Sequence, residues 1–327
     1  MPDRAVALCD DLPIMSRTTT LRVALLVALA ALFAPLFVAF SGPATSAPPV
    51  APDPQKDHFW LPKRCVGDEP GRYVPDAPGP CYVTLPVRKD RPTVVLWGDS
   101  HAWQHLPAIA PLAKKRRVNL VLFMIGGCPP IFISEKAKPN LAACETSNRM
   151  ALRFVRALKA QGKEFRVLMG AFWDGYYKVY KDVYVDKTAN PKQWTKVQLR
   201  SARTFHKLTP QLISTLGREG IRVDLIGQAT SVPADPPACL QGSNPYKCAL
   251  PRKVAKPREA HWKKWFRTMK RRLPAGSRVI NGFTNTYCVK SKCHGFTDGV
   301  YTYFDHTHLS ASRTKTFKKF YAPSFRF

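Results

Sequence analysis

Apolar runs that suit β-strands alternate with helical patterns along most of the chain after residue 92, and this alternation constrains the fold more than any other feature. Repeated strand–helix units predict a parallel sheet with helices on both faces. We therefore expect an α/β protein, a three-layer α/β/α sandwich with a central parallel sheet. The predicted strands are 93–97, 118–124, 165–171, 221–226 and 277–281, and the predicted helices are 102–115, 147–160, 194–218, 259–272 and 310–321.

An apolar run at residues 23–40 follows Arg17 and Arg22, which predicts either an export signal or a transmembrane anchor. We favour an uncleaved anchor, with residues 1–22 as its cytoplasmic flank. The stretch "MSRTTTLR" is an ordinary basic flank, so Met15 is an alternative translation start. The Pro-rich residues 41–64 are the predicted linker, and residues 65–327 are the predicted extracytoplasmic domain.

Nine cysteines are present, and the eight that follow the apolar run fall into four pairs of near neighbours. In an oxidising compartment such pairs predict disulfides that close four local loops. No CxxC pair and no paired histidines accompany them, so the spacing does not suit a zinc site, and we expect no metal and no cofactor. The predicted bridges are Cys65–Cys81, Cys128–Cys144, Cys239–Cys248 and Cys288–Cys293.

The formal net charge is +29, with 51 basic and 22 acidic side chains, so an anionic partner is expected. The chain lacks RNP, zinc-finger and helix-turn-helix signals, and the export segment favours a partner in the cell envelope over nucleic acid. Anionic lipid headgroups or a phosphate-rich or uronic-acid-rich envelope polymer are the expected partners, and a solvated basic face is the alternative. The basic residues are scattered along the chain and include four short runs, 114–117, 252–258, 263–272 and 315–319.

Chemically capable side chains follow the predicted strands where their carboxyl ends meet, which is where open α/β sheets bind ligands. Ser100 follows the first strand, "GGCPP" at 126–130 the second and "AFWDGYY" at 171–177 the third, while "DHTHLS" at 305–310 precedes the last helix. A serine at a strand-to-helix turn can act as a nucleophile, with the adjoining N–H groups and the helix dipole stabilising an oxyanion. These four segments therefore predict one site.

The histidine of the last segment completes a serine-based constellation. Asp305 precedes His308 by three residues, so its carboxylate can hold the imidazole Nδ1–H while Nε2 faces Ser100. Each residue also has a structural interpretation. Ser100 can be a helix N-cap, Asp305 can form an Asx turn and Ser310 can cap the last helix.

These segments together resemble the SGNH hydrolase superfamily, also called GDSL-like. The closest resemblance is to the SGNH branch that is fused to, or found beside, integral-membrane acyltransferase-3 proteins, which O-acetylate envelope polysaccharides. The resemblance covers roughly residues 60–327 and rests on "GDSHA" at 98–102, "GGCPP", "YCVKSKC" at 287–293 and "DHTHLS". It implies that Ser100 is the nucleophile, His308 the general base and Asp305 the residue that orients it.

The resemblance also implies an oxyanion hole made by the N–H of Ser100 and that of Gly126 or Gly127. The superfamily's third block usually contributes an asparagine, and Trp173 lies in the corresponding segment here. Trp173 either supplies its indole N–H or lines a sugar subsite, or else it packs in the core. His101, next to the nucleophile, is a second candidate for lining the substrate.

The expected function is that of an exported, membrane-tethered serine O-acyltransferase or esterase. It would move acyl groups, O-acetyl in the branch it resembles, on or off a cell-envelope glycan through an acyl-serine intermediate. A separate acyltransferase-3 type membrane protein would supply acyl groups to a transferase. The alternative is a non-catalytic basic module that binds an anionic envelope polymer or docks such a membrane acyltransferase.

Overall fold

The computed structural model describes residue 53 and residues 56–67, 74–75, 77–134, 142–180, 196–230, 249–305 and 307–327. All of these belong to one compact unit, Pro49–Phe327. The apolar run 23–40, predicted as an anchor or signal, lies outside the described residues, and so do Cys239 and Cys248. Among the helices of the described part, none is both long and apolar enough to cross a membrane.

A six-stranded sheet forms the centre of this unit. Five of its strands are parallel, and β1 pairs antiparallel with β3 at one edge. The five predicted strands all occur, whereas β1 lies in a segment for which no strand was predicted. The sheet order is β1 (Pro80–Tyr82), β3 (Asn119–Met124), β2 (Thr93–Gly98), β4 (Phe165–Gly170), β5 (Val223–Ile226) and β7 (Arg278–Ile280).

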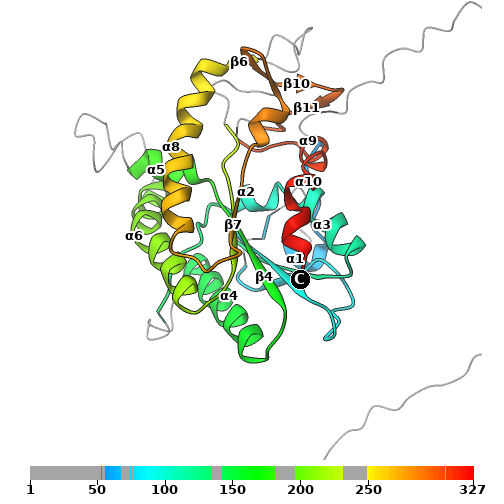
Figure 1. Cartoon of the computed structure of the whole chain (residues 1–327), viewed down its shortest axis with the longest axis vertical. Helices are drawn as coiled ribbons and strands as arrows, with labels where there is room; N and C mark the ends of the chain where they lie inside the picture. The colour runs from blue at the N-terminus through cyan, green and yellow to red at the C-terminus, as the bar shows by residue number, and fades with distance from the viewer. Residues whose placement is uncertain are drawn as a thin grey trace, which may run out of the picture. The chain divides into compact units, whose positions relative to one another are not determined.

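Helices cover both faces of the sheet, which confirms the predicted α/β/α sandwich. Side chains of β2 alternate between two buried clusters, Val94 and Leu96 on one face and Val95 and Trp97 on the other. Figure 1 shows the helices on the two sides of the sheet. One side carries α3 (Leu106–Lys115), α9 (Ala311–Lys315) and α10 (Lys318–Tyr321), and the other carries α4 (Ala143–Ala160), α5 (Trp173–Tyr180), α6 (Lys196–Arg218) and α8 (Arg252–Lys270).

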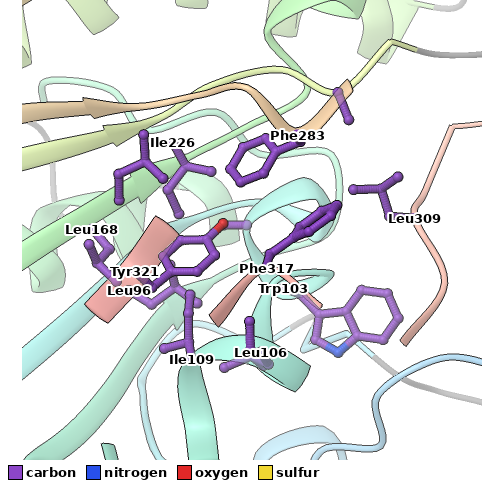
Figure 2. Close-up of a cluster of buried hydrophobic side chains, with 14 of the residues drawn as sticks. Leu96, Trp103, Leu106, Ile109, Leu168, Ile226, Phe283, Leu309, Phe317 and Tyr321 are labelled. Carbon is purple, nitrogen blue, oxygen red and sulfur yellow. The ribbon is translucent and has the colours of Figure 1, made fainter. Parts of the chain in front are cut away.

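The first of these clusters joins the sheet to the C-terminal helices (Figure 2). Leu96 of β2 lies close to Tyr321 of α10, and Phe317 packs beside Phe283 with ring centroids 4.9 Å apart. The same cluster extends to Trp103 and Leu309, which lie next to the predicted active site. The last residues of the chain therefore pack against the strand that precedes Ser100.

Two predicted helices are interrupted. The predicted helix 102–115 is divided into α2 (Ser100–Trp103) and α3, because Pro107 has no N–H with which to bond to the carbonyl of Trp103. The predicted final helix 310–321 is divided into α9 and α10. There the hydroxyl of Thr316 donates to the carbonyl of Arg313, which is a common competitor of helical bonding.

Segments expected to be irregular contain short elements near the carboxyl edge of the sheet. They are α5, the three-stranded sheet β6 (Ala249–Pro251), β9 (Lys292–His294) and β8 (Cys288–Val289), and the hairpin β10 (Phe296–Thr297) and β11 (Val300–Tyr301). The remaining elements are α1 (Lys63–Val66), η5 (Phe283–Thr286) and η6 (Ala322–Phe325).

Three of the four predicted disulfides lie within the described residues, and all three are formed, Cys65–Cys81, Cys128–Cys144 and Cys288–Cys293.

Candidate active site

The turn after β2 sets the position of Ser100. Gly98 has φ +157°, and a Cβ there would lie 1.7 Å from the carbonyl oxygen of Gly170, so glycine is needed where β2 passes β4. Asp99 is the N-cap of α2, and its Oδ1 accepts the His101 N–H at 2.8 Å. The N-cap predicted at Ser100 is thus one residue earlier, and the Ser100 hydroxyl is left for another partner.

That partner is His308. Its Nε2 lies 2.7 Å from the Ser100 Oγ, and its Nδ1 lies 2.7 Å from the Asp305 Oδ2. An ionised carboxylate only accepts hydrogen bonds, so the proton between Asp305 and His308 belongs to Nδ1. Nε2 is then the acceptor for the Ser100 hydroxyl proton. The structure brings the three residues into the serine–histidine–carboxylate arrangement that activates a serine.

Asp305 is held by its own turn while it orients the histidine. Its Oδ1 accepts the backbone N–H groups of Thr307 at 2.7 Å and His308 at 2.6 Å, so the Asx turn and the contact with the imidazole coexist. Burial tends to raise the pKa of Asp305, but the hydrogen bonds and charge of His308 and the N–H of Thr307 outweigh it, and the net pKa lies below its usual value. The carboxylate is therefore ionised at neutral pH.

Gln104 joins the two halves of the site, and the sequence analysis did not identify it. Its Oε1 accepts the Leu309 N–H at 2.7 Å, next to His308, while its Nε2 lies 3.5 Å from the Nδ1 of His101. The side chain is buried. The sign available in the sequence was an amide four residues after Ser100. Gln104 fixes the loop that carries His308.

Aromatic rings surround the imidazole of His308, whose side chain is 12% exposed. Phe304 stacks on it with centroids 5.4 Å apart, Trp103 approaches edge-on at 6.3 Å, and His101 lies at 4.4 Å. His101 in turn stacks on Phe172, which follows β4. His101 is 4% exposed, so only a small part of its surface is open to a substrate.

Asp99 is buried and connects the turn that carries Ser100 to the segment after β4. Its Oδ2 accepts the Phe172 N–H at 2.9 Å and the Tyr176 hydroxyl at 2.5 Å. Burial raises the pKa of Asp99 above its usual value, even though these hydrogen bonds and that of His101 lower it. The side chain is satisfied within the protein, which fits a structural role.

The two glycines proposed as oxyanion donors differ in their availability. The Gly126 N–H donates to the carbonyl of Pro75 at 3.3 Å and is therefore already engaged. Gly127 is exposed, has φ +65°, and a Cβ built on it would meet nothing within 4 Å. In the part of the chain that the structure describes, neither the Ser100 N–H nor the Gly127 N–H has an acceptor. Gly127 is thus the better candidate of the pair.

The loop that carries these glycines is fastened to α4 and to β2. Asn148 of α4 donates to the carbonyl oxygens of Cys144 and Pro129, and its Oδ1 accepts from the Trp97 indole at 2.8 Å and the Ile131 N–H at 2.9 Å. The Cys128–Cys144 disulfide spans the same corner. The buried Asn148 was also not identified from the sequence, although it is a polar residue on the apolar face of a predicted helix.

Trp173 neither lines the substrate nor offers its indole N–H to an oxyanion, which corrects two of the three expectations for it. Its side chain is fully buried between Phe205 and Trp265, and its indole N–H donates to the carbonyl of Ile226 at 2.8 Å. The indole N–H is therefore not available to an oxyanion. The alternative of core packing is the one that the structure supports, because α5 begins at Trp173 and turns its side chain into the second core cluster.

The end of the predicted linker packs against this site. The carbonyl of Asp57 accepts the Ala311 N–H at 2.7 Å, and its Oδ1 accepts from the N–H and hydroxyl of Ser312, both at 3.0 Å. The carbonyl of Phe59 accepts from the indole of Trp103 at 3.1 Å. A linker composition gave no indication of these contacts.

Comparison with known proteins places the chain in a described family. The model of the SGNH domain (fused to AT3 domains) matches residues 64–323. No curated protein matches the chain. One similar solved structure is the periplasmic domain of a Salmonella ser. Paratyphi A lipopolysaccharide acetyltransferase, with 14% identity, a TM-score of 0.45, and coverage of 72% of this chain and 83% of that one. A likeness at that level carries no argument about function.

Proposed function

Because the chain belongs to the family of SGNH domains fused to AT3 domains, we propose that it is a serine O-acyltransferase or esterase that acts on a cell-envelope glycan. One observation carries this proposal, the continuous hydrogen-bonded series from Asp305 through His308 to Ser100, with both links at 2.7 Å. The series lies at the carboxyl end of β2, where ligands bind in open α/β sheets. A purely structural helix start needs none of these contacts.

The proposed reaction has two steps. The Ser100 Oγ attacks the carbonyl carbon of an acyl ester while the hydroxyl proton passes to the His308 Nε2, and the N–H groups of Ser100 and Gly127 hold the oxyanion. Collapse of this intermediate expels the alcohol, which takes the proton from His308. An acceptor hydroxyl then gives its proton to His308 and attacks the acyl-serine, and collapse breaks the bond to the Ser100 Oγ, which takes the proton back from His308. A sugar hydroxyl as acceptor gives transfer, and water gives hydrolysis.

The family supports the proposed partner and location. Its members are described as fused to AT3 domains, so a membrane acyltransferase-3 type protein is the proposed source of acyl groups. The three disulfides of the described residues favour an oxidising, extracytoplasmic compartment. Anchoring through residues 23–40 remains part of the proposal.

The test is detection of an acetyl-enzyme. The purified protein is incubated with p-nitrophenyl acetate, quenched in acid and digested, and the peptide that contains Ser100 is examined by mass spectrometry. We expect one acetyl group on Ser100, which is lost when incubation continues after the ester is removed, and lost faster when a sugar acceptor is present. Ser100→Ala abolishes it, while the matched control Ser291→Ala, an exposed serine in the β8–β9 turn, retains it. Acetylation that does not depend on Ser100 contradicts the proposal.

A second function, binding of an anionic envelope polymer, is favoured by a groove between α3 and α10. The fold brings together there Lys115 of the run 114–117 and Lys318 and Lys319 of the run 315–319, beside apolar residues. A cavity of about 340 Å³ there is lined by Pro111, Leu112, Lys115, Lys318, Lys319 and Ala322. If the groove binds polyanions, Lys318→Glu with Lys319→Glu weakens retention on polygalacturonate, and Lys263→Glu with Lys264→Glu on α8 does so less. Equal effects of the two pairs argue against this function.

A further inference from the structure

A series of aromatic rings in contact, one pair stacked and the next two tilted, runs from His308 to the surface. Phe304 stacks on His308, and His58 lies 5.5 Å from Phe304. Trp60 follows, with its ring centroid 4.2 Å from that of His58. The side chain of Trp60 is 56% exposed, whereas Trp103, which lies 6.0 Å from His58, is fully buried. The series therefore ends in an open indole, three ring contacts away from His308.

Trp60 is held in place from both sides in the chain. Phe59 accepts the Trp103 indole N–H through its carbonyl, and Leu61 is 6% exposed within the first core cluster. Asp57 is fixed to the start of α9, which follows the loop of His308. These contacts order the backbone that carries the solvent-facing ring of Trp60. A ligand that stacks on this ring therefore does not have to bear the entropic cost of ordering the backbone.

The Trp60 segment lies outside the residues that the family model matches. That match begins at residue 64, and the aromatic platform begins with His58. His58 and Trp60 thus lie before the matched residues, whereas Phe304 and His308 lie within them. Large aromatic rings make favourable contacts with flat, partly apolar partners while their polar edge stays in water.

We propose that Trp60 is a stacking platform for a pyranose ring of the acceptor glycan. This inference rests on the proposed function, because it assigns the substrate class to the same site. The apolar face of a pyranose presents polarised C–H groups, which suit the negative face of an indole, and its hydroxyls remain exposed around the edge.

The test measures binding separately from chemistry. Full-length protein carrying Ser100→Ala is purified in mild detergent, and saturation-transfer NMR is recorded with chitohexaose, cellohexaose and hexagalacturonate. We expect transfer to the ring C–H protons of at least one oligosaccharide, with a dissociation constant that rises about three- to tenfold when Trp60→Ala is added. Trp60→Phe, which keeps a smaller ring, should give an intermediate value.

Leu85→Ala is the matched control, because Leu85 is 58% exposed and lies between β1 and β2, at the amino-terminal edge of the parallel strands. It should leave the dissociation constant unchanged. Equal binding by the Trp60→Ala and parent proteins overturns the proposal, and so does the absence of saturation transfer to all three oligosaccharides. Because the measurement is made without Ser100, its outcome is independent of whether Ser100 forms an acetyl-enzyme.

Discussion

The Nε2 of His308 lies 2.7 Å from the Oγ of Ser100, although 208 residues separate the two in the chain. This contact depends on how the loop before α9 docks on the end of β2. Gln104 holds the loop through the Leu309 N–H, and Asp57 holds the first residues of α9. The geometry of the candidate site therefore depends on side chains that touch no substrate.

Gln104 should be a positioning residue. Gln104→Ala leaves the Leu309 N–H without its acceptor and frees the loop of His308, and we expect kcat/KM for p-nitrophenyl acetate to fall about ten- to hundredfold. The unpaired buried N–H should also lower the free energy of unfolding by about 1–3 kcal/mol. Gln161→Ala, at the exposed end of α4, is the control. Activity equal to that of the control would remove Gln104 from the account.

Asp305 should make stability depend on pH in the acid range. Its pKa in the folded protein is lowered, so its ionised form stabilises the fold above the usual carboxyl pKa of 3.8, and this contribution is lost as the pH falls through the lower folded value. We expect Asp305→Asn to lower the Tm at pH 7, and the difference from the native protein to shrink below about pH 4. Thermal unfolding between pH 3 and 7 measures it. A difference that grows on acidification contradicts the assignment.

The disulfides should differ in their effect on stability. The Cys128–Cys144 bridge closes a loop with a sequence separation of 16 and the Cys288–Cys293 bridge one of 5. Loop-closure entropy then gives about 3 kcal/mol for the first and about 2 kcal/mol for the second. Replacing both cysteines of each pair by serine, followed by denaturant unfolding, tests the order. The first variant should also lose activity, because that bridge fastens the loop of Gly127.

Trp173 should affect stability and not substrate affinity. Trp173→Ala removes a fully buried indole and its bond to Ile226, and we expect a loss of about 3–5 kcal/mol in the free energy of unfolding. The KM for a soluble acyl ester should stay within twofold of the native value wherever the variant remains folded. Denaturant unfolding and steady-state kinetics measure the two quantities. A large rise in KM without a loss of stability would indicate that Trp173 contacts the substrate, and would contradict its assignment to the core.

The sheet could be predicted from the sequence because its strands are continuous apolar runs. Short apolar runs that alternate with helical patterns are typical of buried parallel strands. Ser100 was identified because it follows one of these strands, and Asp305 and His308 because of their spacing of three and the resemblance of their segment to the family. The break between α2 and α3 was missed, although Pro107 marks it, because the apolar spacing continues past residue 105. The spacing of apolar residues shows which face of a helix is buried. It does not show where the helical backbone hydrogen bonds are interrupted.

The residues that were missed at the site act through tertiary contacts. Gln104 and Asn148 bond to segments far along the chain, and nothing in their local sequence states which segment they meet. The same holds for Asp57 and Trp60, whose Pro-rich surroundings are typical of a linker. Trp173 shows the opposite error. It lies in a segment expected to contribute to the site, but its side chain packs in the core. The local sequence pattern indicates which residues are candidate catalytic or substrate-lining residues. Tertiary packing determines which of these side chains face the site.

The most direct test of the account is covalent labelling of the purified protein by a fluorophosphonate, read by intact mass. An activated serine reacts with this probe, so the account predicts a single adduct on the native protein, none on Ser100→Ala and much slower labelling of His308→Ala. Ser291→Ala should label like the native protein. An adduct that survives Ser100→Ala, or no adduct while a control serine esterase labels fully, would contradict the central claim that Ser100 is an activated nucleophile.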